Sequence, residues 1–329
     1  MHKIAFIIPY YGKFPSFFQF FLNSCKPNHE IDWYIFSDID ITEFELPDNV
    51  KYINMNFNEL RILVQSKFDF KISLNTPYKL CDYKPAYGYI FEEYLKGYDF
   101  WGYCDIDLLF GDLSKFITED ILITYDRIGH LGHCALYRNT KLTNTLFMQE
   151  INGIIRYRQV FSTDSICIFD EWGINSINSI AFANDIKLLL WSDFFDVYPY
   201  DNNFKNATSI INTNNMTCTT KQDAMPSVIT YENGKLFSHA LLRPMKEHAY
   251  VHLQKRNMLI NCSTEHNHIL LYPDIIVPYN NHITGKAIYK ILFGLIFNHK
   301  CIRNNFNKLK YFVAEKTGNL RHKFKKHKV

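Results

Sequence analysis

Short apolar runs recur along the first part of the chain, and each has the length of a β-strand. They are KIAFIIP (Lys3–Pro9), DWYIFSD (Asp32–Asp38), VKYINM (Val50–Met55) and YDFWGYCDID (Tyr98–Asp107). Segments with helical spacing lie between them, among them FNELRILVQSKF and KLCDYKPAYGYIFEEYL before the fourth run. Near-continuous apolar runs are typical of strands that are buried on both faces of a parallel sheet. The alternation therefore predicts an α/β fold with a mostly parallel central sheet flanked by helices.

The composition indicates a globular protein. The chain has 329 residues, of which 47% are hydrophobic and 16% aromatic, and this excludes a disordered chain. The length allows one large domain with additions or two modest ones. The net charge of +3 is too small to indicate nucleic acid as a partner.

The cysteines and the longest apolar runs bear on location. The eight cysteines form no CxxC pair, so no zinc or thioredoxin-like motif is present. Scattered single cysteines favour reduced thiols and a cytoplasmic protein. No run reaches the ~18 apolar residues that a membrane span needs. The apolar run at the N-terminus is broken by Pro9, so we interpret it as a strand and not as a signal peptide.

The pattern changes beyond residue 111. DRIGHLGHCALYRN predicts two short strands around glycines, and helical stretches are expected between Lys141 and Phe161. Asn233-Gly234 between extended arms predicts a β-hairpin. Residues 286–313 have apolar positions at helical spacing among lysines and arginines, which predicts an amphipathic basic segment. Such a segment can bind an anionic membrane surface or form an ordinary packed helix.

The strand Tyr98–Asp107 ends in Asp105-Ile106-Asp107. Side chains two apart on a strand face the same way, so both carboxylates can point into the crevice at the strand's carboxyl end. Two converging carboxylates repel each other unless a cation lies beside them. Mg²⁺ and Mn²⁺ accept hard oxygen ligands and are usually shared with substrate phosphates. The motif thus predicts a metal–diphosphate site, although a loop with two solvated or helix-capping aspartates remains the simpler alternative.

A phosphohydrolase also carries a DxD after an apolar strand, with the first aspartate as nucleophile. Such enzymes place the motif near the N-terminus, often with Thr or Val two residues after the second aspartate. Here the motif follows a hundred residues, and position 109 is Leu. This reading is therefore the weaker one.

Three later segments carry further candidates. In HLQKR, His252 can complete a metal shell, and Lys255 and Arg256 can stabilise a departing diphosphate. In GHLGHC, His130 and His133 lie beside glycines that let a ligand approach the backbone closely, so both could contact the acceptor or the donor sugar. In FDEWGIN, Asp170 and Glu171 adjoin Trp172, and either could deprotonate an acceptor hydroxyl in an inverting enzyme. The alternatives are a packed histidine with surface cations, a turn with incidental histidines and an acidic helix start.

Three motifs together carry a resemblance: YKLCDYKPAYG (residues 78–88), DFWGYCDIDLLFGD (residues 99–112) and HLQKR (residues 252–256). On these motifs the chain resembles bacterial glycosyltransferases of the GT-A fold, and most closely the transferases encoded in surface-polysaccharide loci for capsule and lipopolysaccharide O-antigen. The resemblance covers about residues 1–255. It implies a nucleotide-sugar lying across the carboxyl ends of the first strands, with the DxD holding Mn²⁺ or Mg²⁺ on its diphosphate.

The resemblance also implies roles for individual residues. Pro9, Tyr10 and Tyr11 would line the nucleotide pocket, and Asp38 would accept a hydrogen bond from a uracil imide. Lys79 and Asp82 would lie at the donor, Asp82 on ribose or sugar hydroxyls, and Lys84 would reach the diphosphate. Asp105 would contact the ribose or the metal, Asp107 would bind the metal, and His252 would be the third ligand. Lys255 and Arg256 would neutralise phosphate.

The resulting hypothesis is a metal-dependent hexosyltransferase. It would move a sugar, galactose on family grounds, from a UDP-sugar to a saccharide or lipid-linked acceptor, and the sequence leaves retention or inversion open. We expect a GT-A domain over residues 1–255, with a nucleotide-sugar half (1–113) and an acceptor half (114–255). Residues 256–329 would form a basic, partly helical extension that could hold a cytoplasmic enzyme on the inner membrane face. A non-catalytic nucleotide-sugar binding protein on the same scaffold is the main alternative.

Overall fold

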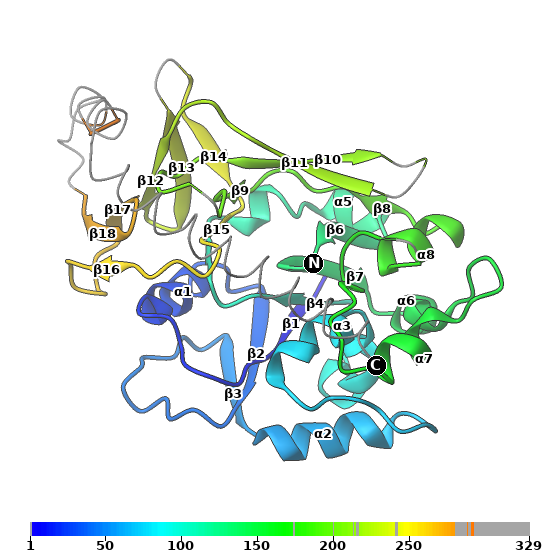
Figure 1. Ribbon diagram of the computed structural model, residues 1–329. Coiled ribbons are helices and arrows are strands. Elements are labelled where there is room, and N and C mark those ends of the chain that lie inside the picture. The colour runs from blue at the N-terminus through cyan, green and yellow to red at the C-terminus, as the bar shows by residue number, and fades with distance from the viewer. Residues whose placement is uncertain are drawn as a thin grey trace, which may run out of the picture.

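A computed structural model of the chain describes residues 2–279 apart from residues 174, 200, 213, 215, 216, 241 and 242, together with residues 288, 291 and 292. The described residues form a mixed α/β fold with four sheets, of seven, six, three and two strands. Figure 1 shows the six-stranded sheet at the top of the molecule and helix α2 at the bottom, with the seven-stranded sheet between them.

The seven-stranded sheet has the order β3-β2-β1-β4-β7-β6-β8. Its strands are β1 (Ile4–Pro9), β2 (Ile31–Ser37), β3 (Val50–Asn54), β4 (Phe100–Cys104), β6 (Arg127–Leu131), β7 (Cys134–Arg138) and β8 (Leu188–Leu189). Strands β3, β2, β1 and β4 are mutually parallel, as the four apolar runs predicted. Strand β7 is antiparallel to both β4 and β6. The expected single, mostly parallel sheet is thus only part of a larger mixed arrangement.

Strand β1 explains why these apolar runs are nearly continuous. Its alternate residues enter two different cores on the two faces of the sheet. Ile4, Phe6 and Ile8 pack with α1 (Phe18–Cys25), whereas Ala5 and Ile7 pack with α2 (Phe57–Ser66). A strand that is buried on both faces has no position for a polar side chain.

Helices cover the sheet in mostly short pieces. The remaining ones are α3 (Leu80–Tyr83), α4 (Tyr87–Ile90), α5 (Glu119–Thr124), α6 (Lys141–Asn144), α7 (Arg156–Phe161) and α8 (Ile177–Ala183). Single 3₁₀ turns span Pro77–Lys79, Lys84–Ala86, Glu92–Leu95, Leu113–Lys115 and Leu146–Met148. The predicted helical stretch around Pro85 is therefore broken into turns, since proline lacks the N–H that a continuous helix would use.

The six-stranded sheet has the order β14-β13-β12-β17-β18-β16. Its strands are β12 (Ser227–Glu232), β13 (Lys235–Ala240), β14 (Lys246–His248), β16 (Leu259–Ile260), β17 (His268–Tyr272) and β18 (Ile275–Pro278). Asn233 and Gly234 both have positive φ, 48° and 84°, and they form the predicted hairpin turn between β12 and β13. A separate antiparallel pair consists of β10 (Ala207–Asn212) and β11 (Thr217–Gln222).

Residues 256–279 differ from the prediction. We expected a helical extension to begin there, but the segment forms β16, β17 and β18, and β17 pairs with β12. The alternate residues Ile269 and Leu271 are buried in the core shared with α1, which is the period of a strand and not of a helix. The division of the domain at residue 113 into a nucleotide-sugar half and an acceptor half stays a prediction, and β4 pairs with β7 across it.

The tail prediction lies almost wholly outside the described residues. Within the predicted amphipathic segment, the structure describes Ile288, Ile291 and Leu292. The side chains of Ile288 and Leu292 are buried against Val228 and Leu270. These two apolar side chains therefore pack on the six-stranded sheet. Across the part of the chain that the structure describes, we find no helix with the length and apolar character needed to cross a bilayer.

The three-stranded sheet joins distant parts of the chain. Its central strand β15 (Tyr250–His252) lies antiparallel to β5 (Leu108–Phe110) and parallel to β9 (Phe195–Asp196). In this register His252 lies opposite Leu108 on one side and Asp196 on the other. The strand that follows the DxD thereby brings residues far along the sequence to the same place.

Candidate metal and donor site

Asp105 and Asp107 lie in the turn between β4 and β5, at the carboxyl ends of the parallel strands. Strand β4 ends at Cys104, so the two carboxylates converge through a turn and not through the strand alternation that we expected. The Asp105 N–H donates to the His133 carbonyl at 2.9 Å, and the Leu253 N–H donates to the Asp107 carbonyl at 2.9 Å. The backbone on both sides of the motif is thus held by neighbouring strands and loops.

His252 lies beside the two aspartates, as the sequence predicted. One candidate ligand atom from each of Asp105, Asp107 and His252 falls within 4.8 Å of the others. The His252 Nε2 is 3.4 Å from Asp107 Oδ1. That oxygen is buried and accepts no hydrogen bond of normal geometry from any described residue. A buried carboxylate oxygen without a donor suits a cation, and two carboxylates with one imidazole suit Mn²⁺ or Mg²⁺.

The charges at this point compensate one another. Burial alone would lower the pKa of His252, but the carboxylates of Asp107 and Asp196 outweigh it and raise the pKa to about 10. Burial would raise the pKa of Asp107, but His252 and the Lys255 backbone N–H and ammonium outweigh it and lower the pKa. Both groups are therefore ionised at neutral pH.

Lys255 is oriented by an unusual backbone. Gln254 and Lys255 both have left-handed φ angles, 53° and 57°, which residues other than glycine adopt rarely. This turn directs the Lys255 N–H to Asp107 Oδ2 at 2.7 Å. The Lys255 Nζ lies 4.6 Å from the centre of the exposed Tyr78 ring. An ammonium group and an aromatic face thus stand next to the carboxylates, where a diphosphate is expected.

Arg256 does not have the phosphate role that we expected. Its guanidinium is buried over the Phe204 ring and donates to the Asp201 carbonyl. A longer contact of 3.4 Å joins it to Asp274. Arg256 therefore holds two loops together, and its charge is used inside the protein.

Lys84 forms an ion pair with Asp105. Its ammonium donates to Asp105 Oδ1 at 2.6 Å and to the Gly132 carbonyl at 2.7 Å. Asp170 Oδ2 is 3.9 Å away. Burial would lower the pKa of Lys84, but Asp105 and Asp170 outweigh it and raise the pKa. Lys84 thus links the DxD to the second pair of acidic residues.

Asp170 and Glu171 are brought to the site through Gly132. The Gly132 N–H donates to Glu171 Oε1 at 3.0 Å. A Cβ on Gly132 would lie 2.3 Å from Asp170 Oδ2 and 2.9 Å from Glu171 Oε1, so a side chain there would require both carboxyl groups to move. Burial raises the pKa of Asp170 to about 8, against the opposing effect of Lys84. Two carboxyl groups therefore converge within reach of Lys84 and Asp105.

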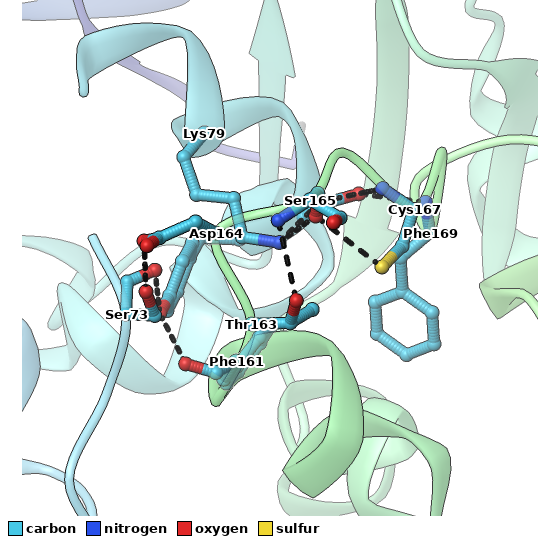
Figure 2. A network of polar contacts seen from close by, with 10 residues as sticks. Ser73, Lys79, Phe161, Thr163, Asp164, Ser165, Cys167 and Phe169 are labelled. Atoms are coloured by element: carbon cyan, nitrogen blue, oxygen red, sulfur yellow. Dashed lines mark hydrogen bonds and ion pairs between the residues drawn. The ribbon is translucent and has the colours of Figure 1, made fainter. Parts of the chain in front are cut away.

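Lys79 and Asp82 are not available to a donor. Their ion pair, Nζ to Oδ2 at 2.7 Å, is wholly buried, and Lys79 also donates to the Ser165 carbonyl at 2.6 Å. Asp82 accepts the N–H groups of Cys167 and Phe169. Figure 2 shows Lys79 reaching from its turn to the segment that carries Ser165, Cys167 and Phe169. The pair therefore positions the segment that leads to Asp170, in place of the donor contacts that we expected.

The two predicted acceptor histidines are also buried. His133 Nε2 is 3.0 Å from the Tyr250 hydroxyl, and its ring centre is 4.3 Å from that of His252. Burial lowers the pKa of His133, which keeps it neutral. His130 packs edge-on against Trp172 at 5.8 Å. Neither ring lines an open surface, because the interior of the sheet leaves 4% of His130 and 5% of His133 exposed.

The residues that were predicted to line the pocket for the nucleobase remain partly accessible to solvent. Pro9, Tyr10 and Tyr11 are half-buried at the end of β1, and Asp38 is exposed just after β2. The pKa of Tyr10 is raised by burial and then by Asp107 and Asp105, so this phenol lies close to the motif. The pKa of Tyr11 is raised by burial and then by Asp38. All four residues therefore lie at the carboxyl edge of the sheet, and Tyr10 among them lies near the motif.

Sequence reasoning missed Asp196 and Gln254. Asp196 Oδ1 lies 2.9 Å from His252 Nδ1 and accepts the Gln254 side-chain N–H at 2.7 Å. The two-residue strand β9 carries no motif, so only the pairing of β9 with β15 could have revealed it. A pocket of about 510 Å³ lies elsewhere, between α1 and the β12–β13 hairpin, and it contains none of the predicted residues.

The sequence matches a family model described as a family of unknown function, DUF6625, over residues 6–280. The chain belongs to this family. No curated protein is detectably similar to it. Among solved structures, a galactosyltransferase LgtC in complex with donor and acceptor sugar analogs is 11% identical, over 60% of this chain and 76% of that one, with a TM-score of 0.32. A likeness of this size decides neither the fold nor the activity of this DUF6625 protein.

Proposed function

We propose that this protein is a divalent-metal-dependent glycosyltransferase of the GT-A type. The observation that carries the proposal is the meeting of Asp105, Asp107 and His252 at the carboxyl ends of parallel strands, with Asp107 Oδ1 buried and without a hydrogen-bond donor among the described residues. This is the edge at which α/β sheets bind nucleotides. The donor in this proposal is a UDP-hexose such as UDP-galactose, as the resemblance implied.

The three candidate metal ligands and the residues around them would bind different parts of the donor. Asp105, Asp107 and His252 would hold Mn²⁺ or Mg²⁺, and the bound ion would neutralise charge on the diphosphate leaving group. Lys255 lies beside Asp107 and would add a positive charge from the protein itself. Tyr10, Tyr11 and Asp38 would border the base. Lys84 holds Asp105 in place through a short ion pair.

The second acidic pair supplies a proton acceptor. Burial raises the pKa of Asp170 to about 8, so this carboxyl group keeps its proton at neutral pH. Glu171 is less buried and is positioned by the Gly132 N–H. In an inverting reaction Glu171 is therefore the better base for an acceptor hydroxyl, and Asp170 would shape the pocket around it.

The acceptor is proposed on the resemblance alone. It would be a saccharide or lipid-linked oligosaccharide of bacterial surface-polysaccharide biosynthesis. The cytoplasmic face of the membrane would be its place of action, with the basic tail beyond residue 292 as the membrane contact. Binding of the full chain to vesicles that contain anionic lipid, compared with a chain ending at residue 292, would test that part.

The central experiment measures UDP release by the full chain across a panel of UDP-sugars, with Mn²⁺ or with EDTA. We expect release that depends on Mn²⁺ and that is lost in Asp107→Ala. Asp48→Ala, which removes an exposed carboxylate far from the motif in the sequence, is the matched control and should keep activity. Full turnover by Asp107→Ala would overturn the metal role. UDP binding without transfer to any acceptor would favour a binding protein on this scaffold.

A further inference from the structure

Asp196 is a buried carboxylate with no assigned task. It lies in β9 beside His252 in the paired strand β15. Only 7% of it is exposed, and its backbone N–H donates to the Asn206 side chain at 3.1 Å. Its Oδ1 is 2.9 Å from His252 Nδ1 and accepts a second bond from Gln254 at 2.7 Å. The carboxylate is therefore fixed by its own strand and aimed at one nitrogen of the histidine ring.

The other nitrogen of the same ring faces the DxD. His252 Nε2 is 3.4 Å from Asp107 Oδ1, the buried oxygen that has no hydrogen-bond donor of normal geometry. The ring thus lies between two carboxylates, one on each nitrogen. A histidine that binds a metal commonly donates its second N–H to a carboxylate, which fixes the tautomer and the ring orientation.

We propose that Asp196 is the positioning residue of the metal site: it orients His252 so that Nε2 is the ligand atom. The proposal rests on the proposed function, because it needs a cation held by Asp105, Asp107 and His252. Gln254 supports it by donating to the same Asp196 oxygen, and His133 supports it by packing its ring against that of His252.

A second metal between His133, Asp196 and His252 is the competing interpretation, since their ligand atoms also lie within 4.8 Å. The hydrogen bonds favour the positioning role. Asp196 Oδ1 already has two partners, and His133 Nε2 has the Tyr250 hydroxyl at 3.0 Å. Asp107 Oδ1, by contrast, accepts no hydrogen bond of normal geometry from a described residue and has only the His252 Nε2 contact at 3.4 Å. The oxygen that lacks a donor lies on the Asp105 side of His252, so the cation belongs there.

The test measures Mn²⁺ binding to the full chain in the absence of any sugar, with electron paramagnetic resonance as the readout. The intensity of the signal from free Mn²⁺ gives the dissociation constant. Modulation of the electron spin echo by ¹⁴N shows whether an imidazole nitrogen is bound directly to the ion. We expect Asp196→Asn to weaken Mn²⁺ binding by about 10- to 100-fold and to change the nitrogen modulation. Gln254→Ala should weaken binding less. Asp193→Asn, which changes a half-exposed carboxylate near the start of β9, is the matched control and should bind as the wild type does.

The outcomes separate the two proposals. A wild-type chain that binds no Mn²⁺ would overturn the metal site and, with it, the role of Asp196. A wild type that binds Mn²⁺ with the nitrogen signal, together with an Asp196→Asn variant of equal affinity and equal modulation, would overturn only the role of Asp196. Circular dichroism of the metal-free variants checks folding. If Asp196→Asn does not fold, Gln254→Ala decides, and unchanged affinity and modulation there would contradict the proposal.

Discussion

Lys79 and Asp82 form an ion pair in which both side chains are almost completely removed from solvent, at 1% and 0% exposed. The pair joins the turn before α3 to the segment 163–169, because Lys79 donates to Ser165 and Asp82 accepts from Cys167 and Phe169. A charge in such a place is stable only while its partner is present. The position of Asp170, which follows directly on this segment, therefore depends on two side chains that do not face the site.

Asp82→Asn should destabilise the protein by about 3–5 kcal/mol, because it leaves the Lys79 ammonium buried without a counter-charge. Urea unfolding measures this free energy, and hydrogen exchange should rise at the amides of Cys167 and Phe169. The double variant Lys79→Met with Asp82→Asn should recover part of the loss. Glu93→Gln, which breaks the exposed pair with Lys96, should have little effect. Equal losses for the buried and exposed variants would contradict this account.

Gly132→Ala should disturb the acidic pair, since the added Cβ would lie 2.3 Å from Asp170 Oδ2. We expect a loss of about 1–3 kcal/mol in stability, as for other overpacked sites, together with loss of transfer activity. Combining it with Asp170→Ala removes the nearest obstructing atom. The double variant should then be more stable than the sum of the single effects predicts, and simple additivity would show that the steric explanation is wrong.

His130 should make the protein sensitive to acid. Burial and Arg127 lower the pKa of His130 to about 4, below the 6.5 of a free imidazole. The unfolded chain therefore takes up a proton at a higher pH than the folded chain does. Stability from this residue is full above pH ~6.5 and falls by about 1.4 kcal/mol per pH unit down to pH ~4. His130→Phe should flatten the pH dependence of urea unfolding in that window.

The control for the acid experiment is His29→Phe, since the His29 side chain is 79% exposed. This variant should keep the wild-type slope of stability against pH. The ring of His130 has no hydrogen-bond partner on either nitrogen among the described residues, so phenylalanine can replace it without leaving a donor or acceptor unmatched. An unchanged slope in His130→Phe would exclude this histidine as the titrating group.

Ile168 carries backbone strain next to the acidic pair. Its φ is 53°, a region that β-branched residues avoid, and the residue is 52% exposed. Replacement by glycine removes the strain, which is about 1–2 kcal/mol for an L-residue in this conformation. Ile168→Gly should therefore be less destabilising than Ile166→Gly by about that amount, because Ile166 is similarly exposed without a positive φ. Equal losses in urea unfolding would show that Ile168 is unstrained.

Local patterns in the sequence were sufficient for the local structure. The apolar runs became β1 to β4, the segment after Asn56 became α2, and Asn233-Gly234 became a hairpin turn. The prediction was wrong for the segment just beyond residue 255, which forms three short strands where we expected a helical extension. Strands of two to five residues have too few alternations to be recognised, and β12, which pairs with β17, lies far back in the sequence.

The predictions for the candidate site were also correct in part and wrong in part. The DxD and HLQKR motifs predicted that Asp105, Asp107 and His252 would lie together, and they do, although the aspartates converge through a turn and not through strand alternation. The same reasoning failed for Lys79, Asp82 and Arg256, whose charges are satisfied inside the protein. Nothing in a single sequence distinguishes a lysine that meets a ligand from one that meets a buried aspartate. Asp196 was invisible because its role depends on the register of β9 against β15.

The pairing of β15 between β5 and β9 has a consequence for biosynthesis. A ribosome that has released the first two hundred residues has already delivered both aspartates of the DxD and the whole seven-stranded sheet. It has not delivered His252, which lies opposite Leu108 in the finished protein. Between the synthesis of residue 107 and that of residue 252, the nascent chain therefore carries both carboxylates without the imidazole that completes the ligand set. The proposed cation site can therefore form only late in synthesis, after β15 has left the exit tunnel and paired with β5 and β9.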